Sequence, residues 1–195
     1  MILLVSLLLG LMAGFLRARL AGRSLQPVDI KNILLVFIGY LPQFFAFFLP
    51  ATKFKIPDHW IPAVLIGSQL LLLLFVISNF RLPGFWMLGL GLLSNFLAIV
   101  MNGGMMPLPL ENAVKLIEPG SGIILEPGNR AGFGKDIVLL KEDIQLWFLG
   151  DIFMLPDWLN YPLAFSIGDI FIGMGAFWLL WELGGPQNLN QEVSP

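Results

Sequence analysis

The chain is organised around residues 150–173, which read GDIFMLPDWLNYPLAFSIGDIFIG. Asp151 and Asp169 bracket an aromatic, proline-marked stretch within this segment. No charged residue follows Asp169 until Glu182, so Asp169 stands at the head of an apolar helix. A carboxylate in that place is costly unless it has a partner or lies near the water boundary. Asp169 therefore either caps the helix or takes part in chemistry there.

The composition predicts a membrane protein whose main partner is the lipid bilayer. Hydrophobic residues make up 57% of the chain and charged residues only 12%, whereas soluble domains carry about 25% charged residues. The net charge of -2 gives no reason to expect a nucleic-acid partner. The chain has no cysteine and only one histidine, His59. Thiolate catalysis and clusters of Cys or His metal ligands are therefore excluded, and we expect neither a metal nor a cofactor.

A spanning helix needs about 20 mainly apolar residues, and this length predicts an all-α polytopic membrane protein with about five transmembrane helices. The first apolar run is followed by arginines, whereas a cleavable signal peptide is preceded by its basic residues. Basic residues favour the cytoplasmic side, so we expect a retained first span with the N-terminus outside and the C-terminus inside. The predicted single membrane domain, residues 1–195, has spans at 1–20, 33–50, 60–80, 85–101 and 164–183, an outer loop at 102–163 and a disordered tail at 184–195.

Several residues inside the predicted spans suggest how the helices pack. Pro42 should kink the second span, because proline removes a backbone hydrogen bond. Gly89, Gly91 and Ser94 are small, so the fourth span is predicted to face other helices. Asn95 in the same span is interpreted as an interhelical hydrogen-bonding group rather than as part of a transport path.

The large outer loop is expected to hold short strands and an interfacial helix. The apolar runs Gly122–Leu125 and Ile137–Leu140 are flanked by turn residues, a pattern typical of strands. Residues 141–149 could form a short helix at the interface, with Trp147 at the depth of the lipid headgroups.

Asp151 and Asp169 can be interpreted as a catalytic pair at the outer membrane face. The prolines between them allow the chain to fold back, and two facing carboxylates can share a proton. One could then activate water while the other donates a proton, as in an aspartic protease. The alternative is structural, because Ser166-Ile-Gly-Asp169 has the form of a capping box and Asp151 could be an ordinary interfacial acid.

If the pair is catalytic, a small pocket should surround it. We expect Asn102 and Ser166 to line this pocket as hydrogen-bond donors. Trp158, Tyr161 and Phe165 would form its apolar, substrate-binding rim near the headgroups.

Residues 145–183 resemble the C-terminal part of lipoprotein signal peptidase, the type II signal peptidase. That family has one catalytic aspartate after its third span and a second in a Phe-Asn-x-Ala-Asp motif that opens its last span. Phe165 and Asp169 match the motif, and Asp151 falls on the first aspartate. The resemblance implies a membrane-embedded peptidase with Asp151 and Asp169 as its catalytic residues. The chain lacks the Asp-Arg pair that this family carries before its first aspartate.

The whole chain is more similar to a family of small bacterial multipass membrane proteins of unknown function. The similarity lies in Asn-Gly-Gly-Met-Met-Pro at 102–107, Leu-Gly-Asp at 149–151 and Ser-Ile-Gly-Asp at 166–169. This resemblance implies a location in the bacterial cytoplasmic membrane, but it implies no activity.

Three functions remain open from the sequence. The protein could be an aspartic hydrolase that cuts a membrane-linked peptide or a lipid substrate at the outer face. It could instead be a non-catalytic membrane protein whose outer loop binds a partner and whose aspartates cap helices. A small transporter is the weakest of the three, because the sequence shows no inverted repeat.

Overall fold

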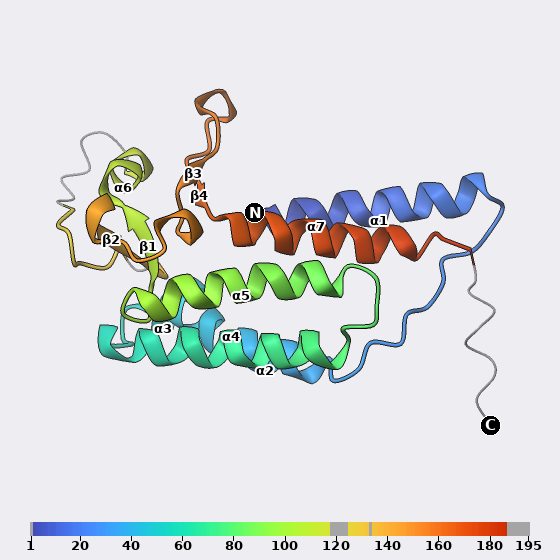
Figure 1. Cartoon of the computed structure of the whole chain (residues 1–195), viewed down its shortest axis with the longest axis horizontal. Helices are drawn as coiled ribbons and strands as arrows, with labels where there is room; N and C mark the ends of the chain where they lie inside the picture. Colours follow the sequence, from blue (N-terminus) through green and yellow to red (C-terminus); the bar gives the residue numbers. More distant parts are fainter. Residues whose placement is uncertain (1, 118–124, 133, 187–195) are drawn as a thin grey trace.

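The computed structural model describes residues 2–117, 125–132 and 134–186, and it is a row of helices with a mixed loop region at one end (Figure 1). The helical elements are α1 (Ile2–Leu20), α2 (Leu34–Gln43), η1 (Phe44–Phe48), α3 (Pro50–Lys53), η2 (Asp58–Trp60), α4 (Ile61–Ser78), α5 (Phe85–Met101), α6 (Leu110–Leu116), η3 (Lys141–Asp143), η4 (Trp147–Leu149), η5 (Asp157–Leu159) and α7 (Ile167–Glu182). The strands are β1 (Met106–Pro109), β2 (Asp136–Leu139), β3 (Phe153–Met154) and β4 (Ala164–Phe165).

Helices occupy all five stretches that the sequence predicts as spans. The helical segments Ile2–Leu20 and Asp58–Ser78 are long and apolar enough to cross a membrane, and Leu34–Phe48 and Phe85–Met101 are shorter apolar helices. The fifth predicted span is shorter at its start than expected, because residues 164–165 form β4 and α7 begins only at Ile167. The predicted disordered tail falls mostly on residues 187–195, which lie outside the described residues.

The five long helices pack side by side in the order α1, α7, α5, α4, α2. Helices α1 and α7 run in the same direction, since Ser6 lies against Gly173 and Gly14 lies against Leu180. Helices α5 and α7 run in opposite directions, since Gly84 lies against Gly175 and Gly91 lies against Gly168. Backbones approach this closely only where side chains are absent or small.

The prediction that Gly91 lies at a helix contact is confirmed. A Cβ atom at Gly91 would lie 2.5 Å from the carbonyl oxygen of Gly168 and 2.7 Å from Cγ1 of Ile172. Gly67, on α4, offers a matched control, because a Cβ atom there would meet nothing within 4 Å.

We therefore expect Gly91→Ala to lower stability and Gly67→Ala not to lower it. Overpacking at Gly91 should lower the free energy of unfolding by about 1–3 kcal/mol. Gly67→Ala should leave it unchanged or raise it by up to about 1 kcal/mol, because alanine favours the helix. Thermal unfolding of the two variants in detergent measures the difference, and equal melting temperatures would contradict the packing of α5 on α7.

The helix type changes just after Pro42, where the sequence predicts a kink. Pro42 lies in the last turn of α2, and the next residues, Phe44–Phe48, form the π-helix η1. A π-helical turn widens the hydrogen-bonding pattern that the proline has interrupted, which allows the segment to continue. The segment ends at Leu49, whose extended backbone precedes Pro50.

The loop region, residues 102–166, is built on a pair of parallel strands. Strand β1 pairs with β2 in the register Met106↔Asp136 to Pro109↔Leu139. Helix α6 follows β1 directly, and Leu108, Ala113 and Val138 form a small buried core between these elements. The predicted strand at 137–140 is thus largely confirmed, whereas β1 was not predicted. Most of the other predicted strand, residues 122–125, lies outside the described residues.

The predicted interfacial helix at residues 141–149 is wrong. The structure has two separate 3₁₀ turns there, η3 and η4. Leu146 between them adopts a left-handed backbone with φ 51°, which an α-helix cannot continue through. Gln145 is also held outside any helix, because its backbone N–H and carbonyl both bond the side chain of Asn102.

Polar contacts attach the loop region to the helices. The Asn102 amide at the end of α5 donates to the carbonyl of Gln145 at 2.8 Å and accepts from its N–H at 2.9 Å. Arg130 forms an ion pair with Asp58, ahead of α4, with an Nη1–Oδ1 distance of 2.7 Å. These links fix the loop region over the ends of α4 and α5, where the candidate site lies.

Strands β3 and β4 form an antiparallel ribbon just before α7. The pairs are Phe153↔Phe165 and Met154↔Ala164, and the two phenylalanine rings stack with centroids 5.6 Å apart. Figure 1 shows that this ribbon projects sideways, across the direction of the helices, from the point where α7 begins. We call residues 153–165 the arm.

Candidate functional site

Asp169 completes the predicted capping box at the start of α7. The Ser166 hydroxyl accepts a hydrogen bond from the backbone N–H of Asp169 at 3.1 Å, and Asp169 Oδ2 accepts from the N–H of Ser166 at 3.1 Å. This reciprocal pair satisfies two backbone donors that a helix start leaves free.

Asn95 on α5 extends this cap across the helix interface. Its Nδ2 atom donates to Asp169 Oδ1 at 3.1 Å, and its Oδ1 atom accepts from the Ser166 hydroxyl at 2.8 Å. Gly168 leaves room for this contact, because a Cβ atom there would overlap the Asn95 side chain. Asn95 therefore has the interhelical role expected from the sequence, and both oxygens of Asp169 have partners.

Asp151 lies in a second polar cluster, at the start of the segment that leads into the arm. The residue is only 2% exposed. Its Oδ2 atom lies 2.6 Å from Nζ of Lys135, and the same ammonium lies 3.1 Å from Oδ1 of Asp136. Asp151 Oδ1 is buried and has no hydrogen-bond partner among the described residues.

The backbone around Asp151 is fixed on both sides. Its N–H donates to the carbonyl of Pro107 on β1 at 3.0 Å. The Asn112 amide on α6 donates to the carbonyls of Asp151 at 3.3 Å and Ile152 at 2.9 Å. Gly150 allows the close approach to β1, since a Cβ atom there would lie 2.9 Å from the Pro107 oxygen. The carboxylate is therefore held by the small core of the loop region.

The carboxylates that act on Asp151 outnumber the cations, since Asp136 and Asp169 oppose the single ammonium of Lys135. Burial, the Lys135 ammonium and the charges of Asp136 and Asp169 together shift the pKa of Asp151 from 3.8 to about 7; burial raises it most, Lys135 lowers it, and the two carboxylates raise it. Burial lowers the pKa of Lys135, but the surrounding carboxylates outweigh this and raise it above its ordinary value. Lys135 thus remains charged, while Asp151 can gain or lose a proton near neutral pH.

The predicted pocket residues are distributed over several places. Ser166 lies in the capping box beside Asp169, whereas the Asn102 amide is engaged with Gln145 and the carbonyl of Ala98. Trp158 and Tyr161 lie at the far end of the arm and are 77% and 49% exposed. Phe165 lies at the base of the arm, stacked on Phe153.

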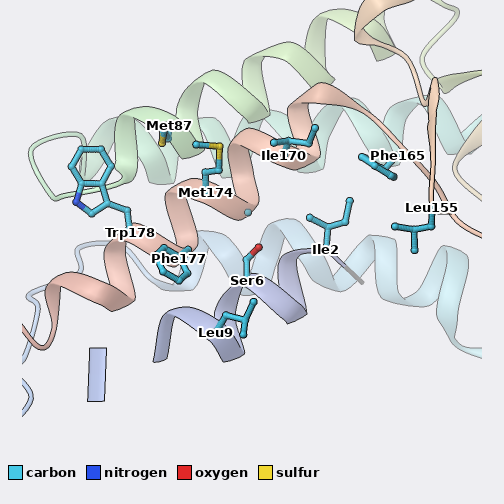
Figure 2. Close-up of a pocket in the computed structure, with 11 residues that line it drawn as sticks. Ile2, Ser6, Leu9, Met87, Leu155, Phe165, Ile170, Met174, Phe177 and Trp178 are labelled. Carbon is cyan, nitrogen blue, oxygen red and sulfur yellow. The ribbon is translucent and has the colours of Figure 1, made fainter. Parts of the chain in front are cut away.

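An apolar groove of about 530 Å³ lies between α1, α7 and the base of the arm (Figure 2). Phe165 and Leu155 come from the arm, and Ile170 immediately follows Asp169 on α7. Ser6 of α1 adds a hydroxyl to an otherwise apolar lining. Phe165 thus lines an apolar groove, but this groove is not the predicted pocket around the two aspartates, because neither Asp151 nor Asp169 lines it.

Sequence reasoning missed Lys135, Asp136 and Asn112 as parts of the site. Lys135 and Asp136 come directly before the predicted strand at 137–140, and it is the pairing of β2 with β1 that brings them to Asp151. Within the described residues, no group of three or more His, Cys, Asp or Glu side chains is arranged to hold a metal ion.

The comparison with known families matches one family model, the family of unknown function DUF5317, over residues 27–181. The chain belongs to this family. The match covers all three motif stretches quoted from the sequence, at 102–107, 149–151 and 166–169, and it includes every residue of both polar clusters. No curated protein and no solved structure matches the chain. The family assignment therefore agrees with an uncharacterised family and leaves the activity to be argued from the site.

Proposed function

We propose that the protein is a multipass protein of the bacterial cytoplasmic membrane, with its N-terminus and the loop region outside and its C-terminus inside. The five apolar helices would be the spans. Arg17 and Arg19 lie in the last turn of the first of them, α1, and Arg23 follows it, and basic residues favour the cytoplasmic side. Helices α5 and α7 are antiparallel, and α1 and α7 are parallel. These directions support an arrangement in which α1 and α7 both enter the membrane from the outer side.

Within this membrane protein we propose an aspartic hydrolase site formed by Asp151 and Asp169. The observation that carries the proposal is the state of Asp151. Its carboxyl group is almost fully buried, one of its oxygens has no partner among the residues that the structure describes, and its pKa is raised to about 7, partly by the charge of Asp169. A carboxyl group that exchanges its proton near neutral pH suits general acid–base catalysis.

In the proposed reaction Asp169 acts as the base and Asp151 as the acid. Asp169 accepts hydrogen bonds from two N–H groups, an arrangement that suits a carboxylate. It would take a proton from water while the water oxygen adds to a peptide or ester carbonyl. Asp151 would give its proton to the leaving amine or alcohol as the carbonyl–heteroatom bond breaks.

Lys135 and Asp136 would support the pair electrostatically. Lys135 supplies a cation and Asp136 an acid next to Asp151. The two residues would thus take the place of the Asp-Arg pair that lipoprotein signal peptidase has and this chain lacks. The resemblance to that family favours a membrane-linked peptide as substrate, and the groove beside Ile170 and Phe165 offers an apolar surface for its lipid-soluble part.

The second candidate is a non-catalytic membrane protein whose loop region binds a partner. The specific observation in its favour is the complete capping box, in which Ser166 and Asn95 occupy both oxygens of Asp169. In this case both aspartates would only position the loop region and α7.

The two candidate functions predict different effects of Asp→Asn variants on the hydrolysis products found in the membrane. Cells that lack the gene would be complemented with the wild type, Asp151→Asn, Asp169→Asn or Asp157→Asn, and their membrane fractions compared by mass spectrometry of protein N-termini and lipids. Asp157 is an exposed carboxylate at the end of the arm and serves as the control. For a hydrolase, products seen with the wild type and Asp157→Asn should be absent with both other variants.

Protein level and melting temperature decide how a loss of product is interpreted. Asn retains the shape of Asp, so each variant should accumulate to near the wild-type level. If both variants are folded and their fractions match the wild type, the hydrolase proposal is wrong and the non-catalytic candidate stands.

A further inference from the structure

The arm presents an apolar, aromatic end that nothing in the described chain covers. Trp158 is 77% exposed, Tyr161 49% and Leu159 43%. Only one charged residue, Asp157, lies in the whole arm. A surface of this kind in water would be unfavourable, which indicates that it contacts another apolar phase.

The arm also has too few paired residues to hold this shape by itself. Its ladder consists of two residue pairs, continued by one bond from the N–H of Leu155 to the carbonyl of Leu163 at 3.0 Å. Two-stranded ribbons are marginally stable in water. The stacked rings of Phe153 and Phe165 fix the base of the arm, so an external contact is needed mainly at its far end.

The place and direction of the arm indicate what that contact is. The arm leaves the bundle at Ser166, the residue that caps α7, and it projects across the helix direction (Figure 1). If α7 crosses a membrane from this point, the arm lies along the surface of the bilayer rather than above it. Trp and Tyr are enriched at this depth, because their rings are apolar and their N–H and O–H groups reach water.

We propose that the arm is a membrane-surface anchor whose far end, Trp158 to Tyr161, inserts into the headgroup layer of the outer leaflet. This proposal rests on the membrane location proposed above, but it does not depend on hydrolase activity. The anchor would hold the base of the arm, and with it Phe165 and Leu155, in place as one wall of the apolar groove (Figure 2).

Spin labelling tests the proposal directly, because the chain contains no cysteine. Leu159→Cys would carry a nitroxide in the full-length protein, reconstituted into vesicles of phosphatidylethanolamine and phosphatidylglycerol. The ratio of collisions with oxygen to collisions with a water-soluble nickel chelate reports depth in the bilayer. Leu8→Cys, on the exposed face of α1, and Ser24→Cys, in the connection after α1, give the membrane and water references.

We expect the ratio at Leu159 to be several-fold higher than at Ser24 and to approach that at Leu8. Adding Trp158→Ser and Tyr161→Ser should lower it toward the Ser24 value without changing the melting temperature in detergent, because both side chains are exposed. A ratio at Leu159 equal to that at Ser24 would overturn the anchor, as would a label that neither reagent reaches, which would indicate contact with protein. If Leu8 itself does not exceed Ser24, the membrane location fails as well.

Discussion

Lys135→Met should lower the free energy of unfolding by about 3 kcal/mol at about pH 8, the low end of the range for breaking a buried ion pair. The loss leaves Asp151 buried without its cation, since the Asp151 side chain is only 3% exposed. The low end applies because the Lys135 side chain is itself 41% exposed, so that solvent screens part of the interaction. Denaturation in detergent, followed by tryptophan fluorescence, measures the change.

The double variant Lys135→Met/Asp151→Asn should recover most of this loss. Removing both partners leaves no uncompensated charge, which is usually far less costly than removing one. Lys115→Met is a matched control, because Lys115 is an exposed lysine on α6 in the same loop region. If the single and double variants are equally unstable, the effect of Lys135 does not pass through Asp151, and the buried pair has been assigned too large a role.

The helices were predictable because residues next to their ends determine where they begin and stop. Helix α5 has the predicted bounds 85–101 since Gly84 precedes it with φ 80° and Gly103 and Gly104 follow with φ 73° and 85°. The capping box of α7 was equally readable, because Ser166 and Asp169 have the required spacing and residue types.

The surroundings of Asp151 could not be predicted, because they depend on contacts between distant segments. Strand β1 contains Pro107 and Pro109, and proline argues against a strand in the sequence. It is nevertheless paired with β2, and that pairing places Lys135 beside Asp151. No periodic pattern encodes a parallel pairing of two strands this short, so the ion pair had no signal in the sequence.

The same limitation applies to the predicted rim of the pocket. In the sequence, Trp158, Tyr161 and Phe165 share an aromatic character and a place between the two aspartates, which predicts a common rim. In the structure the antiparallel pairing of β3 and β4 carries Trp158 and Tyr161 to the far end of the arm and leaves only Phe165 near α7. A two-pair ribbon is too short for its register to be read from alternation of apolar and polar residues.

The stability of the wild type should fall between about pH 4 and about pH 7, and Asp151→Asn should remove most of this fall. The folded protein raises the pKa of Asp151 from 3.8 to about 7, chiefly by burial. A group whose pKa is raised by folding contributes stability that is complete below its unfolded pKa and is lost as the pH rises through its folded pKa. The full effect of Asp151 is bounded at about 4 kcal/mol, since each pKa unit corresponds to about 1.36 kcal/mol.

Lys135 does not compete with this effect in the same pH window. Its pKa is also raised by folding, so its contribution is constant below its ordinary value of 10.5 and is lost only in strong alkali. Unfolding free energies of the wild type, Asp151→Asn and the control Asp157→Asn, measured in detergent across this window, separate the contributions. The wild type and Asp157→Asn should lose stability in parallel as the pH rises, while Asp151→Asn stays nearly level. A wild type that instead gains stability would mean that the ion pair with Lys135 outweighs burial, and that Asp151 is an ordinary ionised partner rather than a group able to give up a proton near neutral pH.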